Sequence, residues 1–122
     1  TIFSNPTGLD EQTTNYSTAQ DLAILGKYIA KKPEIMKIIS QKEYPLYLDS
    51  GILHHNLINT NELLGEIPEI LGGKTGYTEK AGECLLTLSK ISQPEGLRID
   101  IVLGSTDRFR DTRKLLECSS FN

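Results

Sequence analysis

The stretch Gly72-Gly73-Lys74-Thr75-Gly76-Tyr77-Thr78 is the point around which we expect this chain to fold. It sets a lysine and a hydroxyl between glycines, just ahead of two runs of alternating apolar residues. Glycine inside a strand pattern is typical of a place where a ligand or another backbone comes close. Lysine and threonine on such a strand can bind a carboxylate through charge-assisted hydrogen bonds. The stretch therefore predicts a strand that binds a ligand along its edge.

A phosphate-binding P-loop is the first alternative for Gly73-Lys74-Thr75, and the surrounding sequence excludes it. The P-loop pattern requires a glycine five positions before the one that precedes the lysine, and Pro68 stands there. A P-loop also leads directly into a helix, whereas Gly76 and Gly82 interrupt any helical period. The sequence therefore predicts no nucleotide site.

The composition favours one domain and excludes several classes of protein. The 122 residues lie within the range of about 50 to 250 residues that single domains occupy. The net charge of -3 and the pI near 5.4 provide no basic patch for nucleic acid. No apolar run approaches the roughly 20 residues of a membrane span, and the first residues lack a signal-peptide layout. Because the chain has no initiator methionine, we expect it to be processed or truncated.

Two helices are predicted in the first third of the chain, after a loop with turn chemistry at 5–10. Ser17 and Gln20 match a capping box with serine at the N-cap, which predicts a helix over about 18–31. Pro33 at a first helical position opens a second, short helix. We expect its apolar stripe to pack in the core, and this stripe comprises Ile35, Met36, Ile38 and Ile39.

The middle of the chain predicts strands. In residues 42–51, apolar side chains occupy every second position around Pro45. This pattern suits an edge strand that leads to a turn at Ser50-Gly51. Residues 83–92 are apolar on both faces and predict an interior strand. After a turn at 93–96, a strand over 98–104 completes an antiparallel hairpin beside the Lys-Thr-Gly strand.

A last helix follows, capped by Thr106 or Asp107, with an apolar stripe and a basic face that we expect to be solvated. The predicted fold is α/β (α+β), an antiparallel sheet with flanking helices.

Neither the histidines nor the cysteines predict a metal site. His54 and His55 are adjacent on an extended segment, so we expect them to point to opposite faces. Cys84 and Cys118 match no metal-binding spacing, and we expect two buried small side chains, while a disulfide between them stays open. The sequence predicts no metal and no cofactor.

Several short patterns line up in order along nearly the whole chain. They are Asn5-Pro6-Thr7-Gly8-Leu9, Tyr16-Ser17-Thr18-Ala19 with Asp21-Leu22-Ala23, Asn59-Thr60-Asn61 with Leu63-Leu64, Gly73-Lys74-Thr75-Gly76-Tyr77-Thr78, Ala81-Gly82, Val102-Leu103-Gly104 and Asp111-Thr112-Arg113-Lys114-Leu115-Leu116. Together they resemble the later part of the penicillin-binding D-alanyl-D-alanine carboxypeptidases, serine peptidases of the S11 type in the β-lactamase-like superfamily. The resemblance implies an α/β sandwich and an enzyme that removes the terminal D-alanine from peptidoglycan pentapeptides through a serine acyl-enzyme. In that family penicillins acylate the same serine.

The resemblance also implies roles for five residues. Lys74 and Thr75 would bind the substrate carboxylate and organise the protons of the site, and Gly76 would let the substrate backbone approach. The backbone N–H of Tyr77 would be an oxyanion-hole donor, and such donors are typically worth about 3 kcal/mol of barrier each. Arg108 resembles a substrate-binding arginine that some members carry at the start of the last helix.

Two departures from the family pattern shape the functional prediction. Thr60 stands where some members carry an arginine. The sequence also has no Ser-x-x-K, and its only Ser-x-Asn is at 120–122, whereas in the family both motifs precede the segment that begins here at Asn5. We therefore expect residues 1–122 to be the later part of one transpeptidase-like domain, with the carboxylate strand but without the nucleophile. Such a chain would be inactive alone, because a nucleophile needs its base within reach.

The expected ligands are peptidoglycan stem peptides and β-lactams, and the resemblance alone implies an extracytoplasmic location in the cell envelope. Apolar surface left uncovered would favour self-association or a companion N-terminal fragment. Two alternatives stay open: a piece of a β-lactamase, and a non-catalytic binding module that kept the fold and lost the nucleophile.

Overall fold

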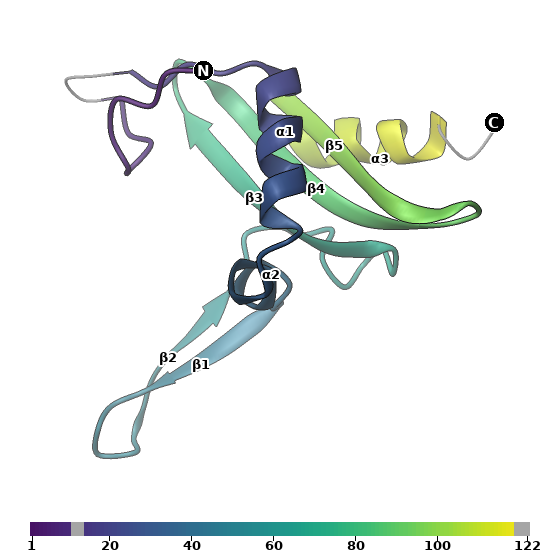
Figure 1. Ribbon diagram of the computed structural model, residues 1–122. Helices are drawn as coiled ribbons and strands as arrows, with labels where there is room; N and C mark the ends of the chain where they lie inside the picture. Colours follow the sequence, from purple (N-terminus) through teal and green to yellow (C-terminus); the bar gives the residue numbers. More distant parts are fainter. Residues whose placement is uncertain (11–13, 119–122) are drawn as a thin grey trace.

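The computed structural model describes residues 1–10 and 14–118, and in them it places three helices and two separate sheets (Figure 1). The elements follow one another as α1 (Ala19–Ile29), α2 (Pro33–Ile39), β1 (Glu43–Tyr47), β2 (Leu53–Ile58), β3 (Ile70–Thr78), β4 (Gly82–Ser92), β5 (Glu95–Ser105) and α3 (Arg108–Cys118). The larger sheet is antiparallel with the order β3-β4-β5. The predicted α/β (α+β) fold, an antiparallel sheet with flanking helices, is confirmed. The Ser-x-Asn at 120–122 lies outside the described residues.

Helices α1 and α3 cover opposite faces of the larger sheet. Neighbouring residues of a strand point to opposite faces. In β4, Leu85 joins a core cluster to which Phe109 of α3 contributes. Leu86 faces the other way, toward α1, where a Cβ placed on Gly26 would lie 3.5 Å from Leu86 and 3.1 Å from Ile99. A glycine at position 26 thus lets α1 lie close to β4 and β5.

The best-buried apolar cluster lies on the α3 side and anchors the segment that enters β3. Its buried members are Leu63, Leu64, Ile70 and Leu85, with Ile67, Phe109 and Leu116 packed against them. Leu63 and Leu64, which precede the Lys-Thr-Gly strand, are therefore part of the core. Burial of each such side chain stabilises the fold by about 1.5 to 3 kcal/mol, so the start of β3 is firmly placed.

Helix α1 begins one residue later than the sequence indicated. Thr18, and not Ser17, is the N-cap, because its side chain accepts a hydrogen bond of 3.1 Å from the backbone N–H of Asp21. The pair Thr18 and Asp21 has the same spacing as Ser17 and Gln20, and it adds an acidic residue in the first turn, where the helix dipole favours negative charge. The predicted serine cap is wrong.

Helix α2 begins at the predicted residue, Pro33, but its apolar stripe is not in the core. Pro33 opens the helix as expected, yet no residue of α2 is buried, and Ile35 and Ile38 are exposed. The reason is that α2 lies at the edge of the sheet, where Ile39 meets β3: a Cβ placed on Gly72 would lie 3.0 Å from the Ile39 side chain. The prediction of core packing is therefore wrong for this stripe.

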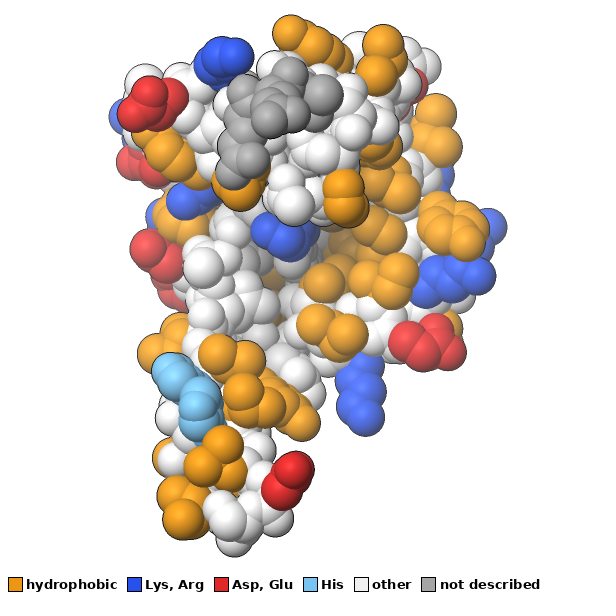
Figure 2. All heavy atoms as spheres, turned by 90° about the vertical axis from the view of Figure 1, so that its left-hand side faces the viewer, with side chains coloured by type: hydrophobic (Ala, Val, Ile, Leu, Met, Phe, Trp, Pro, Cys, Tyr) orange, Lys and Arg blue, Asp and Glu red, His pale blue; other side chains and the backbone are white. Residues whose placement is uncertain are grey.

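Strands β1 and β2 form a hairpin that projects from the rest of the chain (Figure 1), and every residue in both strands is exposed. Its turn uses Gly51 at φ 79°, and the Gly51 N–H donates to the Leu48 carbonyl. The predicted edge strand and its turn are confirmed. Figure 2 shows hydrophobic side chains gathered over this hairpin, with the two histidines among them.

The histidine prediction is wrong in its geometry. The rings of His54 and His55 do not point to opposite faces, because their centroids lie 4.3 Å apart and their Nδ1 atoms share a hydrogen bond. The pairing register shifts between Leu46 and Tyr47 of the partner strand, and this irregularity interrupts the strict alternation of side chains. Among the described residues no group of three or more His, Cys, Asp or Glu side chains can hold a metal ion.

Strand β4 is the interior strand that the sequence predicts, because it pairs with β3 on one side and β5 on the other. Strand β5 begins earlier than predicted, at Glu95, since Ser92 pairs with Glu95 and Ile91 with Gly96. Backbone pairing here extends beyond the alternating apolar residues. The two cysteines are free thiols, and Cys118 is exposed, so the expectation that both are buried is wrong.

Candidate active-site strand

Strand β3 carries the Lys-Thr-Gly stretch at the edge of the larger sheet. In the part of the chain that the structure describes, β3 pairs with β4 alone, so its other edge is open. Thr75 is buried, whereas Lys74 and Tyr77 are exposed. The predicted strand edge is therefore present, with one side of β3 available to a ligand.

Two glycines of this strand permit close contacts of different kinds. A Cβ placed on Gly73 would lie 2.6 Å from the Leu86 carbonyl oxygen and 2.9 Å from Nδ2 of Asn61, so no side chain fits there. A Cβ on Gly76 would meet only the Cβ of Cys84, at an ordinary 3.7 Å. Gly73 is required by the fold itself, while Gly76 leaves space on the side of the hollow described next.

A hollow of about 820 Å³ runs along the open edge of β3. All five residues expected in the site line it, together with Thr60 and the loop near the N-terminus; the lining is Phe3, Asn5, Pro6, Thr7, Gly8, Leu9, Asn15, Thr60, Lys74, Thr75, Gly76, Tyr77 and Arg108. The tertiary structure thus brings residues from four distant segments to one cavity.

The wall opposite β3 is the loop 5–9, which is ordered by its own asparagine. The Asn5 side-chain oxygen accepts hydrogen bonds from Thr7 Oγ1 at 2.9 Å and from the Gly8 N–H at 2.8 Å. Gly8 has φ 77°, a conformation that favours glycine. Thr78 Oγ1 then donates to the Asp10 carboxylate at 2.6 Å, which connects the loop to the end of β3. The predicted loop is confirmed, and it closes one side of the cavity.

Polar contacts inside the hollow centre on Lys74 and Thr75. The Lys74 ammonium donates to the Thr75 carbonyl oxygen. The Thr75 hydroxyl lies 2.5 Å from the Thr60 hydroxyl. The sequence marked Thr60 only as a departure from a family pattern, so its contact with Thr75 was missed.

Arg108 reaches the site from the first position of α3. Its Nη1 donates to the Gly76 carbonyl oxygen at 2.9 Å, and its backbone N–H donates to Glu83 Oε2 at 3.0 Å. The Arg108 Nε also lies 3.8 Å from the same carboxylate oxygen. Asp107 caps the helix by accepting from the Arg110 N–H at 2.9 Å, as predicted. Arg108 is therefore partnered, and not a solvated member of a basic face.

Glu83 does not line the hollow but supports Arg108 beside it, and sequence reasoning missed this role. It pairs with Tyr77 across β3 and β4, and it accepts the first N–H of α3, where a helix dipole favours an anion. Its position directly after Ala81-Gly82 was a signal that it follows the strand turn, but its partner lies 25 residues away.

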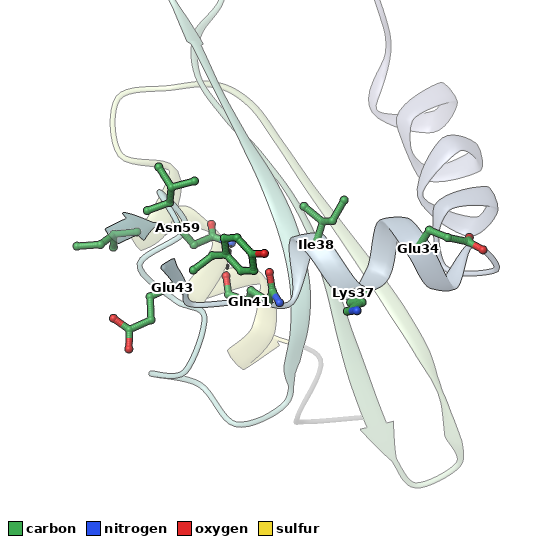
Figure 3. A pocket seen from close by; sticks show the side chains of 9 residues that line it. Glu34, Lys37, Ile38, Gln41, Glu43 and Asn59 are labelled. Atoms are coloured by element: carbon green, nitrogen blue, oxygen red, sulfur yellow. Dashed lines mark hydrogen bonds between the residues drawn. The ribbon is translucent and has the colours of Figure 1, made fainter. Parts of the chain in front are cut away.

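A second hollow, of about 660 Å³, lies between α2 and the β1–β2 hairpin and contains none of the expected site residues. Figure 3 shows Gln41 and Asn59 meeting in it, and Asn59 Nδ2 donates to the Gln41 carbonyl at 2.9 Å. Its lining is Glu34, Lys37, Ile38, Gln41, Glu43, Tyr44, Leu57, Ile58 and Asn59. The residues that the resemblance assigns to the site therefore lie together at the β3 hollow and not in this one.

Comparison with known proteins identifies the family. Residues 1–106 match the family of D-alanyl-D-alanine carboxypeptidases, Peptidase S11. The chain is 41% identical over 121 residues to the D-alanyl-D-alanine carboxypeptidase DacF of Bacillus subtilis, and 32% identical over 126 residues to DacA of Haemophilus influenzae. It covers 30% and 29% of these two relatives, with 96% of its own length in each case.

Solved structures agree with this relationship. Penicillin-binding protein D2 of Listeria monocytogenes, in a cefotaxime-bound form, matches with a TM-score of 0.79 at 36% identity, over 96% of this chain and 47% of that one. A D-alanyl-D-alanine carboxypeptidase of Mycobacterium tuberculosis matches with a TM-score of 0.67 at 27% identity, over 83% of this chain and 36% of that one. The described residues include no helix that is both long and apolar enough to cross a membrane. On the match over residues 1–106 and the similarity to DacF, the chain belongs to the D-alanyl-D-alanine carboxypeptidase family, Peptidase S11.

Proposed function

We propose that this chain supplies the carboxylate-binding strand of a serine D-alanyl-D-alanine carboxypeptidase. The observation that carries the proposal is the meeting of Lys74, Thr75 and Arg108 at one hollow along the open edge of β3. Two cations and a hydroxyl at such an edge suit the free carboxylate at the end of a peptide. The substrate class is a peptide that ends in D-alanyl-D-alanine, as in peptidoglycan stem pentapeptides.

In this proposal the substrate lies in an extended form beside β3. An open strand edge can bind a peptide by main-chain hydrogen bonds. Gly76 presents little bulk there, so a substrate backbone can come close. Lys74 and Thr75 hold the carboxylate, Arg108 adds positive charge beside Gly76, and the N–H of Tyr77 donates to the oxyanion.

The attacking serine is not assigned to this chain. The sequence contains no Ser-x-x-K, so we propose that residues 1–122 form the later part of one domain and are inactive alone. The complete enzyme would remove the terminal D-alanine through an acyl-serine. The same missing motif favours one alternative, a binding module of this fold that does no chemistry.

Partners and location follow as part of the same proposal. Beta-lactams are expected ligands, since the similar Listeria protein has been solved in cefotaxime-bound and ampicillin-bound forms. A peptidoglycan substrate requires an extracytoplasmic site of action in the cell envelope. No metal or cofactor has a role in the proposed reaction.

The carboxylate site can be tested without any nucleophile. We would titrate the 122-residue chain with acetyl-D-alanyl-D-alanine and with its C-terminal amide, following backbone amide shifts by NMR. We expect tighter binding of the carboxylate and loss of that preference in Lys74→Ala, with Lys80→Ala as the matched control. Lys80 is exposed and does not line the β3 hollow. Equal binding of both ligands by the wild-type chain would contradict the proposal.

The catalytic part of the proposal needs a complete protein. A chimera of DacF from Bacillus subtilis, with its matching segment replaced by this chain, tests it directly. We expect the chimera to release D-alanine from a D-alanyl-D-alanine peptide and to lose this activity in Lys74→Ala. A correctly folded chimera without activity would support the non-catalytic alternative.

A further inference from the structure

The Thr60 hydroxyl is the hydrogen-bond partner of the Thr75 hydroxyl, and it comes from outside the sheet. The two Oγ1 atoms lie 2.5 Å apart, and both residues line the hollow that contains Lys74. Thr75 is only 8% exposed, and among the described residues its hydroxyl has no other hydrogen-bond partner. The direction in which Thr75 can donate its proton therefore depends on Thr60.

Thr60 is held in place by the asparagines on either side of it. The Asn59 N–H donates to the Lys42 carbonyl at 2.8 Å, and Asn59 Oδ1 accepts from the Asn61 N–H at 2.9 Å. Asn61 is 2% exposed, and its own Oδ1 accepts from the Leu63 N–H. The connection between β2 and β3 thus holds Thr60 firmly opposite Thr75.

We propose that Thr60 is a positioning residue that directs the Thr75 hydroxyl proton toward a ligand carboxylate. A hydroxyl has one proton to donate and two lone pairs that accept, whereas a carboxylate only accepts. When Thr60 donates to Thr75 Oγ1, the Thr75 proton is free for the ligand, and the two aligned hydrogen bonds strengthen each other. A carboxylate beside Lys74 selects this direction. The inference rests on the proposed function, since it concerns the same carboxylate site.

The size of the effect follows from the coupling between the two hydrogen bonds, because the Thr60–Thr75 bond is present with and without the ligand. An aligned neighbouring bond strengthens a hydrogen bond by about 10 to 30%, which for a bond to a charged group corresponds to a change of about 1.5-fold to 4-fold in an equilibrium constant. Thr60→Val keeps the shape of the side chain and removes the hydroxyl, while Thr60→Ser keeps the hydroxyl. We expect Thr60→Val to reduce the preference for the carboxylate ligand over its amide by about 1.5-fold to 4-fold, and Thr60→Ser to restore it.

The experiment is the same pair of NMR titrations on the 122-residue chain, with acetyl-D-alanyl-D-alanine and its amide. A purely structural role for Thr60 would weaken both ligands equally, so the ratio of the two affinities is the decisive quantity. A double-mutant cycle adds a second measurement: Thr60→Val should have no further effect on that ratio when Thr75→Val is already present.

The outcomes separate this inference from the proposed function. If the wild-type preference and its loss in Lys74→Ala are observed but Thr60→Val keeps the preference, only the role of Thr60 is wrong. That role is also wrong if Thr60→Ser loses as much as Thr60→Val, or if the double mutant is additive. If the wild-type chain has no preference for the carboxylate, the proposed function fails, and the role of Thr60 fails with it.

Discussion

Replacement of Gly73 by alanine is expected to destabilise the sheet beneath the site. The new Cβ would lie 2.6 Å from the Leu86 carbonyl oxygen, which belongs to the central strand, and 2.9 Å from Nδ2 of the buried Asn61. The strand backbone cannot move away without disturbing its pairing with both neighbours. Such overpacking typically costs about 1 to 3 kcal/mol, and a fixed backbone atom places this site at the upper end.

An opposing effect reduces the net change. Alanine lowers the entropy of the unfolded chain relative to glycine, which stabilises the folded state by about 0.4 to 1 kcal/mol where the backbone conformation is compatible. We therefore expect Gly73→Ala to lower the free energy of unfolding by about 2 kcal/mol. Urea unfolding followed by circular dichroism measures this difference.

Gly76→Ala is the matched control on the same strand. Its Cβ would meet Cys84 at an ordinary 3.7 Å, so we expect unfolding free energy within about 0.5 kcal/mol of the wild type. The side chain would nevertheless occupy the ligand edge and weaken carboxylate binding. The reasoning is refuted if Gly73→Ala is as stable as the wild type, or if the two variants are equally destabilised.

Of four further predictions, two concern the chain as a whole and two concern single carboxyl groups. Incubation of the 122-residue chain with cefotaxime should leave its mass unchanged. A mass increase equal to one acyl adduct would show that the attacking nucleophile lies in this chain and would overturn the proposal that it does not. Asp100→Ala should lower the unfolding free energy by about 3 kcal/mol, because it leaves the half-buried Arg98 guanidinium, now 2.7 Å from Asp100, without its carboxylate; an unchanged urea midpoint would count against this. The exposed apolar side chains of α2 and of the β1–β2 hairpin should cause self-association, which sedimentation would detect and a concentration-independent monomer would exclude. The hydrogen bond from Ser105 at 2.6 Å lowers the pKa of Asp111, so Ser105→Ala should raise that pKa in an NMR titration, and its destabilising effect should shrink as the pH falls through the pKa of the folded state.

Local chemistry made several elements predictable. Pro33 begins α2, Asp107 caps α3, and the turn at Gly51 reverses the chain direction between β1 and β2. Each of these features depends on contacts within a few residues. The alternating apolar residues of β4 and β5 indicated an interior hairpin, because strand periodicity is also a local property. These features depend on neighbours in the sequence, which is why the sequence was sufficient.

Errors arose where the outcome depended on which surfaces meet. The stripe on α2 has the spacing of a core helix, but its packing depended on whether another element lies over it. Sequence spacing alone could not decide between Ser17 and Thr18 as the N-cap. The hydrogen bond from the Asp21 N–H to the Thr18 side chain identifies Thr18 as the cap. In both cases the sequence pattern was the same for the two possible outcomes, and only the three-dimensional contacts distinguished them.

By itself, the sequence determined the Lys-Thr-Gly strand, the order of the main elements and the membership of a known family. Short motifs and their order can be identified in the sequence without any knowledge of contacts. Only the tertiary structure decided how the site is assembled around that strand. It placed Thr60 against Thr75 and Glu83 beside Arg108, pairs that are 15 and 25 residues apart. Hydrogen bonds between such distant residues depend on how the strands and α3 pack together, and no local pattern carries that information.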